Sequence, residues 1–301
     1  MFCGFSRSVM GASHIKTGLV CQDSSAHFIG ENFAVGVVAD GHGSKKHFRS
    51  NLGSKFAVEA TIETLQKFYE NIDEFESNLP NNHKMIIRNI EKQVISNWNI
   101  KVTEDLKKNP VTEAEKSKFT SEEFENIQPE SYYGTTLIAS VSGRDYAFGF
   151  QIGDGSLVAI YDDGSTVMPM EYNEAAPANV TASMCNANAA GMFSSFYIND
   201  KRVVAMYTST DGLYTSFGSE FDFLDYHTII TSQLDNLEGF KTTIINNLNK
   251  RSQFGTEDDI SLSCIYNEEL LESCMSAIRA KVDENKQKAA ERRAERLRKQ
   301  I

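Results

Sequence analysis

Short apolar runs recur along the chain and predict β-strands. Three of them occupy residues 34–39, 203–207 and 260–266. Further strands are expected within residues 4–40 and within residues 136–168, and the pattern stays mainly β until a helix begins near residue 222. The sequence therefore predicts a core built largely from β-sheets.

Two other stretches have the 3.6-residue apolar period of an amphipathic helix. The apolar face of the first, which follows residue 43, carries Phe56, Ala60, Leu65 and Phe68. The apolar face of the second carries Ile86, Ile90, Val94, Trp98 and Val102. We interpret both faces as parts of a hydrophobic core. The polar residues 104–130 that follow predict a surface excursion, and the pattern after residue 266 is helical.

An aspartate stands close to each of the three apolar runs. Asp40 and Asp211 come after the first two runs and are each followed by glycine, and Asp258 comes just before the third. Mg²⁺ and Mn²⁺ prefer oxygen ligands and retain several waters, so carboxylates that strand ends deliver to one place are suited to hold such an ion. A glycine beside a ligand lets the backbone turn sharply and approach the ion closely.

An Asp-Gly pair alone is more often a turn than a metal ligand. Asp162-Asp163-Gly164, for example, lies between two strand-like runs and predicts a plain hairpin. The metal interpretation gains weight because the aspartates belong to an ordered set of motifs. These are Gln22-Asp23, Asp40-Gly41-His42-Gly43, Gly134-Thr135-Thr136, Gly153-Asp154, Thr210-Asp211-Gly212 and Asp258-Asp259-Ile260-Ser261.

In order and spacing these motifs resemble the metal-dependent serine/threonine phosphatases of the protein phosphatase 2C family, in the form of a bacterial branch. The resemblance extends over about residues 4–266. It implies an α+β fold, a four-layer α/β/β/α sandwich of two antiparallel sheets flanked by helix pairs. It also implies a catalytic domain at residues 1–267, followed by a charged helical tail at residues 268–301.

The resemblance implies a phosphoprotein phosphatase in which two Mn²⁺ or Mg²⁺ ions activate the water that hydrolyses phosphoserine and phosphothreonine esters. Asp40 is then the carboxylate that bridges both ions, and the carbonyl of Gly41 binds one of them. Asp211 and Asp258 are the ligands of the other ion.

Further residues of the motifs are implied to support this centre. Asp23 is expected to act through metal-bound water. Gln22, Asp259 and Asp154 lie beside the ligands, and Asp259 falls where many members have asparagine. His42 matches the position of a general acid for the leaving alkoxide, a role that a near-neutral pKa suits.

Two positions depart from the family pattern. Gly18 stands five residues before Asp23, where many members have an arginine that binds the substrate phosphate. We expect His14 or Lys16 to supply a positive charge instead, although lysine cannot form the forked contact of arginine. Ser131 stands where some members have an aspartate that helps to bind a third ion.

Two other functions remain open. A pseudophosphatase would use the same fold as a regulatory binding module, and the presence of all three metal-binding carboxylates argues against it. A metal-dependent hydrolase of a small phosphorylated molecule is compatible with Gly18. The partners expected for the leading function are a phosphoprotein substrate and a cognate serine/threonine kinase.

Composition adds a few exclusions. The net charge of −11 argues against nucleic-acid binding and suits carboxylates gathered around a cation. The five cysteines include no Cys-x-x-Cys pair, which predicts reduced thiols, without disulfides or a zinc site. No signal peptide or membrane-length apolar run is visible, so a cytoplasmic protein without membrane association is expected.

Two segments carry open interpretations. Residues 171–200 have no clear period, and the matching segment of the family is a variable flap beside the active site. A disordered surface loop is the alternative. Residues 286–301 contain seven basic and two acidic side chains, which indicates either a solvated, frayed helix or a docking element for an acidic partner.

Overall fold

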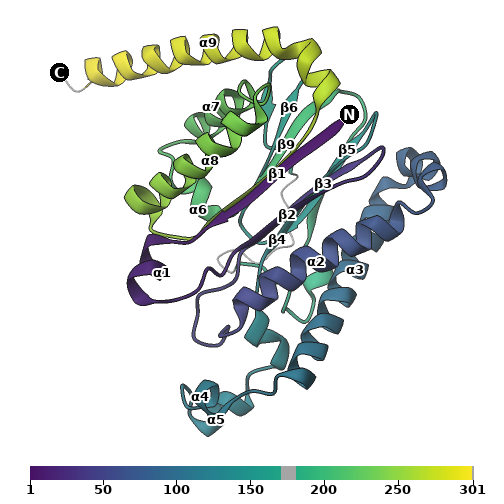
Figure 1. Cartoon of the computed structure of the whole chain (residues 1–301), viewed down its shortest axis with the longest axis vertical. Helices are drawn as coiled ribbons and strands as arrows, with labels where there is room; N and C mark the ends of the chain where they lie inside the picture. Colours follow the sequence, from purple (N-terminus) through teal and green to yellow (C-terminus); the bar gives the residue numbers. More distant parts are fainter. Residues whose placement is uncertain (171–180, 300–301) are drawn as a thin grey trace.

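The computed structural model describes residues 1–170 and 181–299, and this part of the chain forms two five-stranded sheets with helices outside them (Figure 1). The first sheet has the order β1 (Phe2–Val9), β10 (Ile260–Asn267), β9 (Val203–Ser209), β6 (Ser156–Tyr161) and β7 (Thr166–Val167). The second has the order β2 (Ser24–Ile29), β3 (Ala34–Ala39), β4 (Leu137–Ser142), β5 (Ala147–Ile152) and β8 (Ser194–Ile198). All neighbouring strands in both sheets pair antiparallel.

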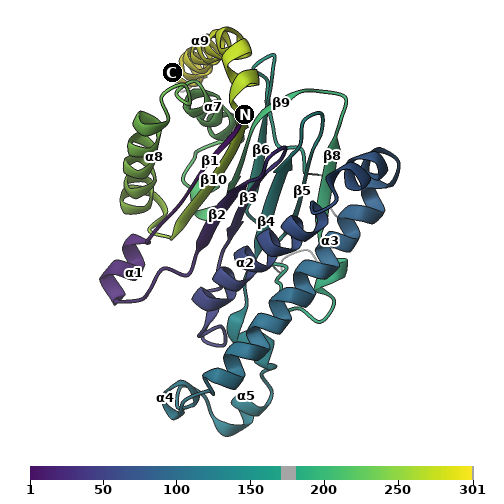
Figure 2. The ribbon, with the colours of Figure 1, turned by 45° about the vertical axis from the view of Figure 1, so that its right-hand side comes forward.

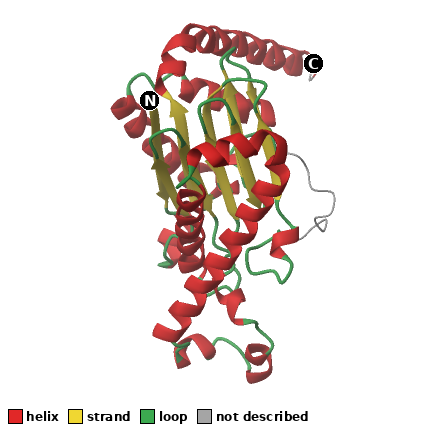
Figure 3. Cartoon of the chain, turned by 90° about the vertical axis from the view of Figure 1, so that its right-hand side faces the viewer, coloured by secondary structure: helices red, strands yellow, loops and turns green. Residues whose placement is uncertain are grey.

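The long helices cover the outer faces of the two sheets (Figure 2, Figure 3). The second sheet is covered by α2 (Ser50–Phe68) and α3 (Ile72–Lys108). The first is covered by α7 (Glu220–Thr231), α8 (Leu237–Arg251) and the start of α9 (Glu268–Lys299). The shorter helical segments are α1 (Ala12–Thr17), α4 (Glu113–Lys116), α5 (Ser121–Glu125), η1 (Pro129–Tyr133), η2 (Ala189–Gly191), α6 (Asp211–Tyr214) and η3 (Ser252–Thr256).

Three apolar layers hold these four layers of secondary structure together. Strand β3 contributes to two of them, because successive side chains point to opposite faces of a strand. Val35 and Val37 belong to the layer shared with α2 and α3, whereas Ala34 and Val38 belong to the layer between the sheets. A strand buried on both faces has an unbroken apolar sequence. The predicted α/β/β/α sandwich is therefore confirmed.

Most of the elements predicted from the apolar periods are present. Gly164, at a φ of 78°, closes the predicted hairpin between β6 and β7. The second predicted helix is longer than its apolar stripe, and α3 bends at Asn82 beside Pro80, which has no N–H for a helical hydrogen bond. The expectation of strands and a turn within residues 4–40 missed α1. That helix has six residues and buries none of them, so it has no apolar period.

Helix α9 joins the core at its start. Leu271, Cys274 and Ile278 are buried in the apolar layer between the first sheet and its helices. Farther along, Arg292 forms an ion pair with Asp225 of α7 at 3.2 Å. The division into a domain at 1–267 and a tail at 268–301 stays a prediction. No helix in the described ranges is both long and apolar enough to cross a membrane.

Candidate active site

Three aspartates lie at neighbouring ends of the strands. Asp40 directly follows β3, Asp211 begins α6 two residues after β9, and Asp258 lies two residues before β10. Strands β9 and β10 are neighbours in one sheet, while β3 belongs to the other. The carboxyl groups of Asp40 and Asp211 contact each other across the gap between the sheets. The structure therefore brings together the carboxylates that the sequence places far apart.

The ionised form of these aspartates is energetically unfavourable in the metal-free protein. Burial raises the pKa of Asp40 well above its usual range, and the neighbouring charges of Asp23 and Asp211 raise it further. Burial likewise raises the pKa of Asp23, Asp211 and Asp258, and each of them is also repelled by at least one neighbouring aspartate. A bound cation would remove this repulsion and favour the ionised carboxylates.

The donor set fits hard cations that keep part of their water shell. The buried Oδ1 atom of Asp211 has no hydrogen-bond partner, so it is available to a ligand. Within residues 1–170 and 181–299, no three His, Cys, Asp or Glu side chains converge closely enough to hold a metal ion without other ligands. Any ion here would therefore need a backbone carbonyl and water in addition to the carboxylates, which is how Mg²⁺ is usually bound.

Gly41 lies where the backbone has no room for a side chain. A Cβ atom at this position would stand 2.5 Å from the carbonyl oxygen of Gln22 and 2.8 Å from that of Ser50. Gly41 also forms an isolated antiparallel bridge with Thr135, and the Oγ1 atom of Thr135 donates a hydrogen bond to the carbonyl oxygen of Asp40 at 2.8 Å. The Gly-Thr-Thr motif thus supports the backbone on both sides of the Asp40–Gly41 peptide.

Asp23 is buried behind this cluster. Thr210 Oγ1 donates to Asp23 Oδ2 at 2.8 Å, and the same hydroxyl accepts the backbone N–H of Ser261 at 2.9 Å. Thr210 therefore links the loop before β2 to the ends of β9 and β10. Its role was not expected from the sequence, which indicated only that it precedes Asp211.

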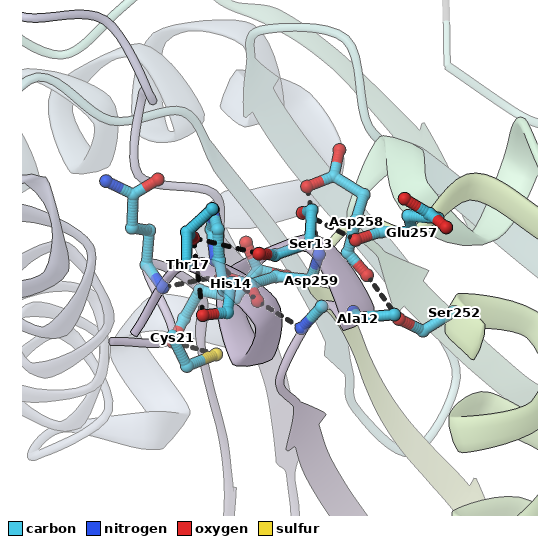
Figure 4. A network of polar contacts seen from close by, with 12 residues as sticks. Ala12, Ser13, His14, Thr17, Cys21, Ser252, Glu257, Asp258 and Asp259 are labelled. Atoms are coloured by element: carbon cyan, nitrogen blue, oxygen red, sulfur yellow. Dashed lines mark hydrogen bonds and ion pairs between the residues drawn. The ribbon is translucent and has the colours of Figure 1, made fainter. Parts of the chain in front are cut away.

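Asp259 collects hydrogen bonds from the N-terminal loop (Figure 4). Its Oδ1 atom accepts the backbone N–H of Gly11 at 2.5 Å and lies 3.0 Å from Nδ1 of His14. Its Oδ2 atom accepts the backbone N–H of Gln22 at 2.6 Å. The carboxylate is 4% exposed and already satisfied by these three groups, so it positions the loop that carries Asp23.

The two residues expected to compensate for the missing arginine have other partners. His14 contacts Asp259, and Lys16 Nζ forms an ion pair with Glu257 Oε1 at 2.6 Å. Gly18 ends α1 in the left-handed conformation, with a φ of 70°. A side chain other than glycine is strained in this conformation, which accounts for the absence of arginine at this position. The phosphate-binding role of His14 or Lys16 stays a prediction.

His42 lies in a compact loop against His47, with 4.9 Å between the ring centroids. Its backbone N–H donates to the carbonyl oxygen of Gly134 at 3.1 Å. Burial lowers the pKa of His42 to about 4, and the charges of His47 and Lys46 add to this effect, while Asp154 opposes it. Without substrate or metal, the imidazole of His42 is therefore neutral at pH 7. This differs from the near-neutral pKa that we expected.

Asp154 stands at the exposed edge of the site. Its charge acts on both Asp211 and His42, and its Oδ2 atom accepts a hydrogen bond from Thr181 Oγ1 at 2.9 Å. Thr181 belongs to the expected flap at residues 171–200 and begins the second described range, so this contact joins the described part of that segment to Asp154. Residues 171–180 of that flap lie outside the described residues.

The buried Arg49 joins the surface excursion to the loop that carries His42 and His47. Nε and Nη2 of Arg49 donate to the two carboxylate oxygens of Glu115 at 2.8 and 3.0 Å, and Nη1 donates to Tyr133 Oη at 2.8 Å. The excursion reaches beyond the end of the sandwich near α4 and α5 (Figure 1). This pairing could not be predicted from the sequence, because Arg49 and Glu115 are 66 residues apart and belong to no motif.

Comparisons with known proteins agree with this geometry. A family model described as protein phosphatase 2C matches residues 10–249 of the chain. A search of curated proteins finds no match.

Solved structures of bacterial phosphatases share the fold. The serine/threonine phosphatase Stp1 from Staphylococcus aureus is 14% identical, with 89% of this chain and 96% of that chain covered and a TM-score of 0.52. PppA, a regulatory component of T6SS in Pseudomonas aeruginosa, is 15% identical, with 88% and 97% covered and a TM-score of 0.52. The catalytic domain of the phosphatase PstP in complex with two manganese ions is 13% identical, with 88% and 97% covered and a TM-score of 0.50.

Proposed function

Because this chain belongs to the protein phosphatase 2C family, we propose that it hydrolyses phosphoserine and phosphothreonine esters of proteins with the help of two Mn²⁺ or Mg²⁺ ions. The observation that supports this most directly is the buried cluster of Asp40, Asp211 and Asp258, whose raised pKa values reflect negative charge that lacks a counter-ion. A site that binds phosphate dianions must contain a source of positive charge, and two cations provide it.

Each residue of the centre has a distinct task in this proposal. Asp40 would hold both ions and the Gly41 carbonyl would hold one of them, while Asp211 and Asp258 would hold the other. Asp23 orients water around the ions and is itself held by Thr210. When bound, the ions supply the positive charge that activates a water and neutralises the phosphoryl oxygens.

The leaving group requires a proton. His42 stands at the rim of the carboxylate cluster and is the imidazole that we assign to the serine or threonine oxygen of the substrate. Its low pKa in the protein alone means that it must take up a proton as the phosphate dianion binds, because a nearby negative charge favours the imidazolium. Asp154, whose charge raises the pKa of His42, assists this uptake.

The substrate in this proposal is a phosphoprotein, and the partner enzyme is the serine/threonine kinase that phosphorylates it. The test is release of phosphate by the purified chain with Mn²⁺ and then with EDTA, first from p-nitrophenyl phosphate and then from phosphoserine and phosphothreonine peptides. Metal-dependent release from the peptides supports the proposal. Release from p-nitrophenyl phosphate alone indicates a small-molecule hydrolase, and release from neither indicates a binding module.

A further inference from the structure

We propose that Lys46 is the side chain that binds the phosphoryl group of the substrate at this site, in the place of the arginine that the family pattern puts at Gly18. This inference rests on the proposed phosphatase function. It assigns a specific residue to phosphate recognition that neither the motifs nor the position of Gly18 indicated.

The fold of the loop places Lys46 next to His47, the residue whose ring packs against His42. The backbone N–H of His47 donates to the carbonyl oxygen of Ser44 at 2.8 Å, which closes a tight turn over residues 44–47. The turn brings the ring of His47 to 4.9 Å from that of His42. Lys46 lies on the turn between them and is exposed.

Lys46 is also free to bind an anion. Segments 12–22 and 41–49, which flank the carboxylates and are described throughout, contain four lysines and arginines. Lys16 pairs with Glu257, and Arg49 pairs with Glu115. Lys45 pairs with Glu123 at 3.3 Å and lies over the ring of Phe119 at 4.5 Å. In these two segments Lys46 is the lysine or arginine without an acidic or aromatic partner.

The charge of Lys46 reaches the site. It contributes to lowering the pKa of His47, after the larger effect of burial. The positive charge of Lys46 therefore acts on the ring that lies 4.9 Å from the ring of His42. A phosphate dianion that approaches a cluster of aspartates is repelled by them, and a free ammonium at the entrance offsets part of that repulsion.

Position 18 is poorly suited to a phosphate-binding side chain. A Cβ atom built there meets no other atom within 4 Å, so a side chain at this position would begin in open space. Its positive φ also disfavours any replacement. A lysine on the histidine loop supplies the missing charge without a change in the backbone of α1.

The test compares Lys46→Gln with its neighbour Lys45→Gln, which removes the same charge one position away. With the Mn²⁺-loaded protein, Lys46→Gln should raise the KM for p-nitrophenyl phosphate and the inhibition constant of inorganic phosphate by about tenfold or more, the loss expected for one charged contact. Lys45→Gln should change both by less than about twofold, since an exposed ion pair contributes little. Lys46→Arg should restore tight phosphate binding, because it keeps the charge.

Calorimetric titration of the Mn²⁺-loaded proteins with inorganic phosphate gives a second measurement that does not need turnover. If the wild-type chain binds phosphate but hydrolyses no ester, the proposed function fails while the role of Lys46 is still tested by the titration. Equal phosphate affinity and equal KM in Lys46→Gln and the wild type would overturn the inference, and so would a loss of equal size in Lys45→Gln. Because Lys46 is exposed, unchanged urea unfolding should confirm that the variant folds.

Discussion

The Nδ1 atom of His14 lies 3.0 Å from the Oδ1 atom of Asp259, although 245 residues separate the two along the chain. The same carboxylate accepts the backbone N–H groups of Gly11 and Gln22. Asp259, which follows the metal-binding Asp258, thus holds in place the loop that carries Asp23. The geometry of the centre therefore depends on a carboxylate that need not contact an ion.

Asp259→Asn should destabilise the protein. An amide can offer only one accepting oxygen, so either the Gly11 or the Gln22 N–H is left without a partner in a buried place, at a cost of about 1–3 kcal/mol. Urea unfolding without metal measures this loss. The adjacent Asp258→Asn is the control, since the raised pKa of Asp258 shows that its ionised form is unfavourable there. Equal destabilisation by both variants would contradict the role given to Asp259.

Asp211→Asn should make the metal-free protein more stable at pH 7, because it removes a carboxylate whose folded-state pKa is raised by burial and by Asp154. In thermal unfolding, Mn²⁺ should stabilise the wild type and should stabilise this variant much less. Phosphatase activity should fall below about a tenth of the wild-type rate. The exposed Asp145→Asn serves as the control and should alter none of the three measurements.

His42→Ala should slow hydrolysis of a phosphoserine peptide about a hundredfold, the usual contribution of a general acid. Hydrolysis of p-nitrophenyl phosphate should be affected much less, since nitrophenolate leaves without a proton. Steady-state rates on the two substrates under the same conditions measure the difference. If both rates fall by the same factor, His42 does not protonate the leaving group.

The metal-binding carboxylates could be predicted because the strands that carry them have a clear apolar period. Asp40, Asp211 and Asp258 each stand beside a strand buried on both faces, and such strands end where their apolar sequence ends. Helix α1 and the pairing of Arg49 with Glu115 could not be predicted, since neither has a periodic pattern. The partners of Arg49 become neighbours only after α2, α3 and η1 have packed.

The lowered pKa of His42 also could not be predicted from the sequence. A histidine in a loop is expected to be exposed and to titrate near its ordinary pKa, whereas His42 is packed against His47 and covered. Burial of this kind depends on η1, at the end of the excursion, where the carbonyl oxygen of Ser131 accepts a hydrogen bond from Nδ1 of His47.

Glu91 should make stability depend on pH far from the site. Burial in α3 raises its pKa from 4.5 to about 7, partly opposed by Arg88. Between pH 4.5 and 7 the unfolded chain loses this proton more readily than the folded one, so the group's contribution to stability falls as the pH rises through that window. Urea unfolding from pH 5 to 8 should show a decrease, on the order of 2 kcal/mol, that Glu91→Gln removes. The exposed Glu104→Gln in the same helix should leave it unchanged.

The carboxylates of Asp40 and Asp211 reach each other from opposite sheets, and those sheets touch through one apolar layer that includes Val38, Ile138 and Met206. The thickness of that layer therefore acts as the spacer that sets how far apart the two halves of the catalytic centre stand. Close packing leaves such a layer little room to yield. A larger side chain at Ile138 would push the two sheets apart and increase the separation of Asp40 and Asp211. The rate of turnover would then change through a residue that does not contact the substrate.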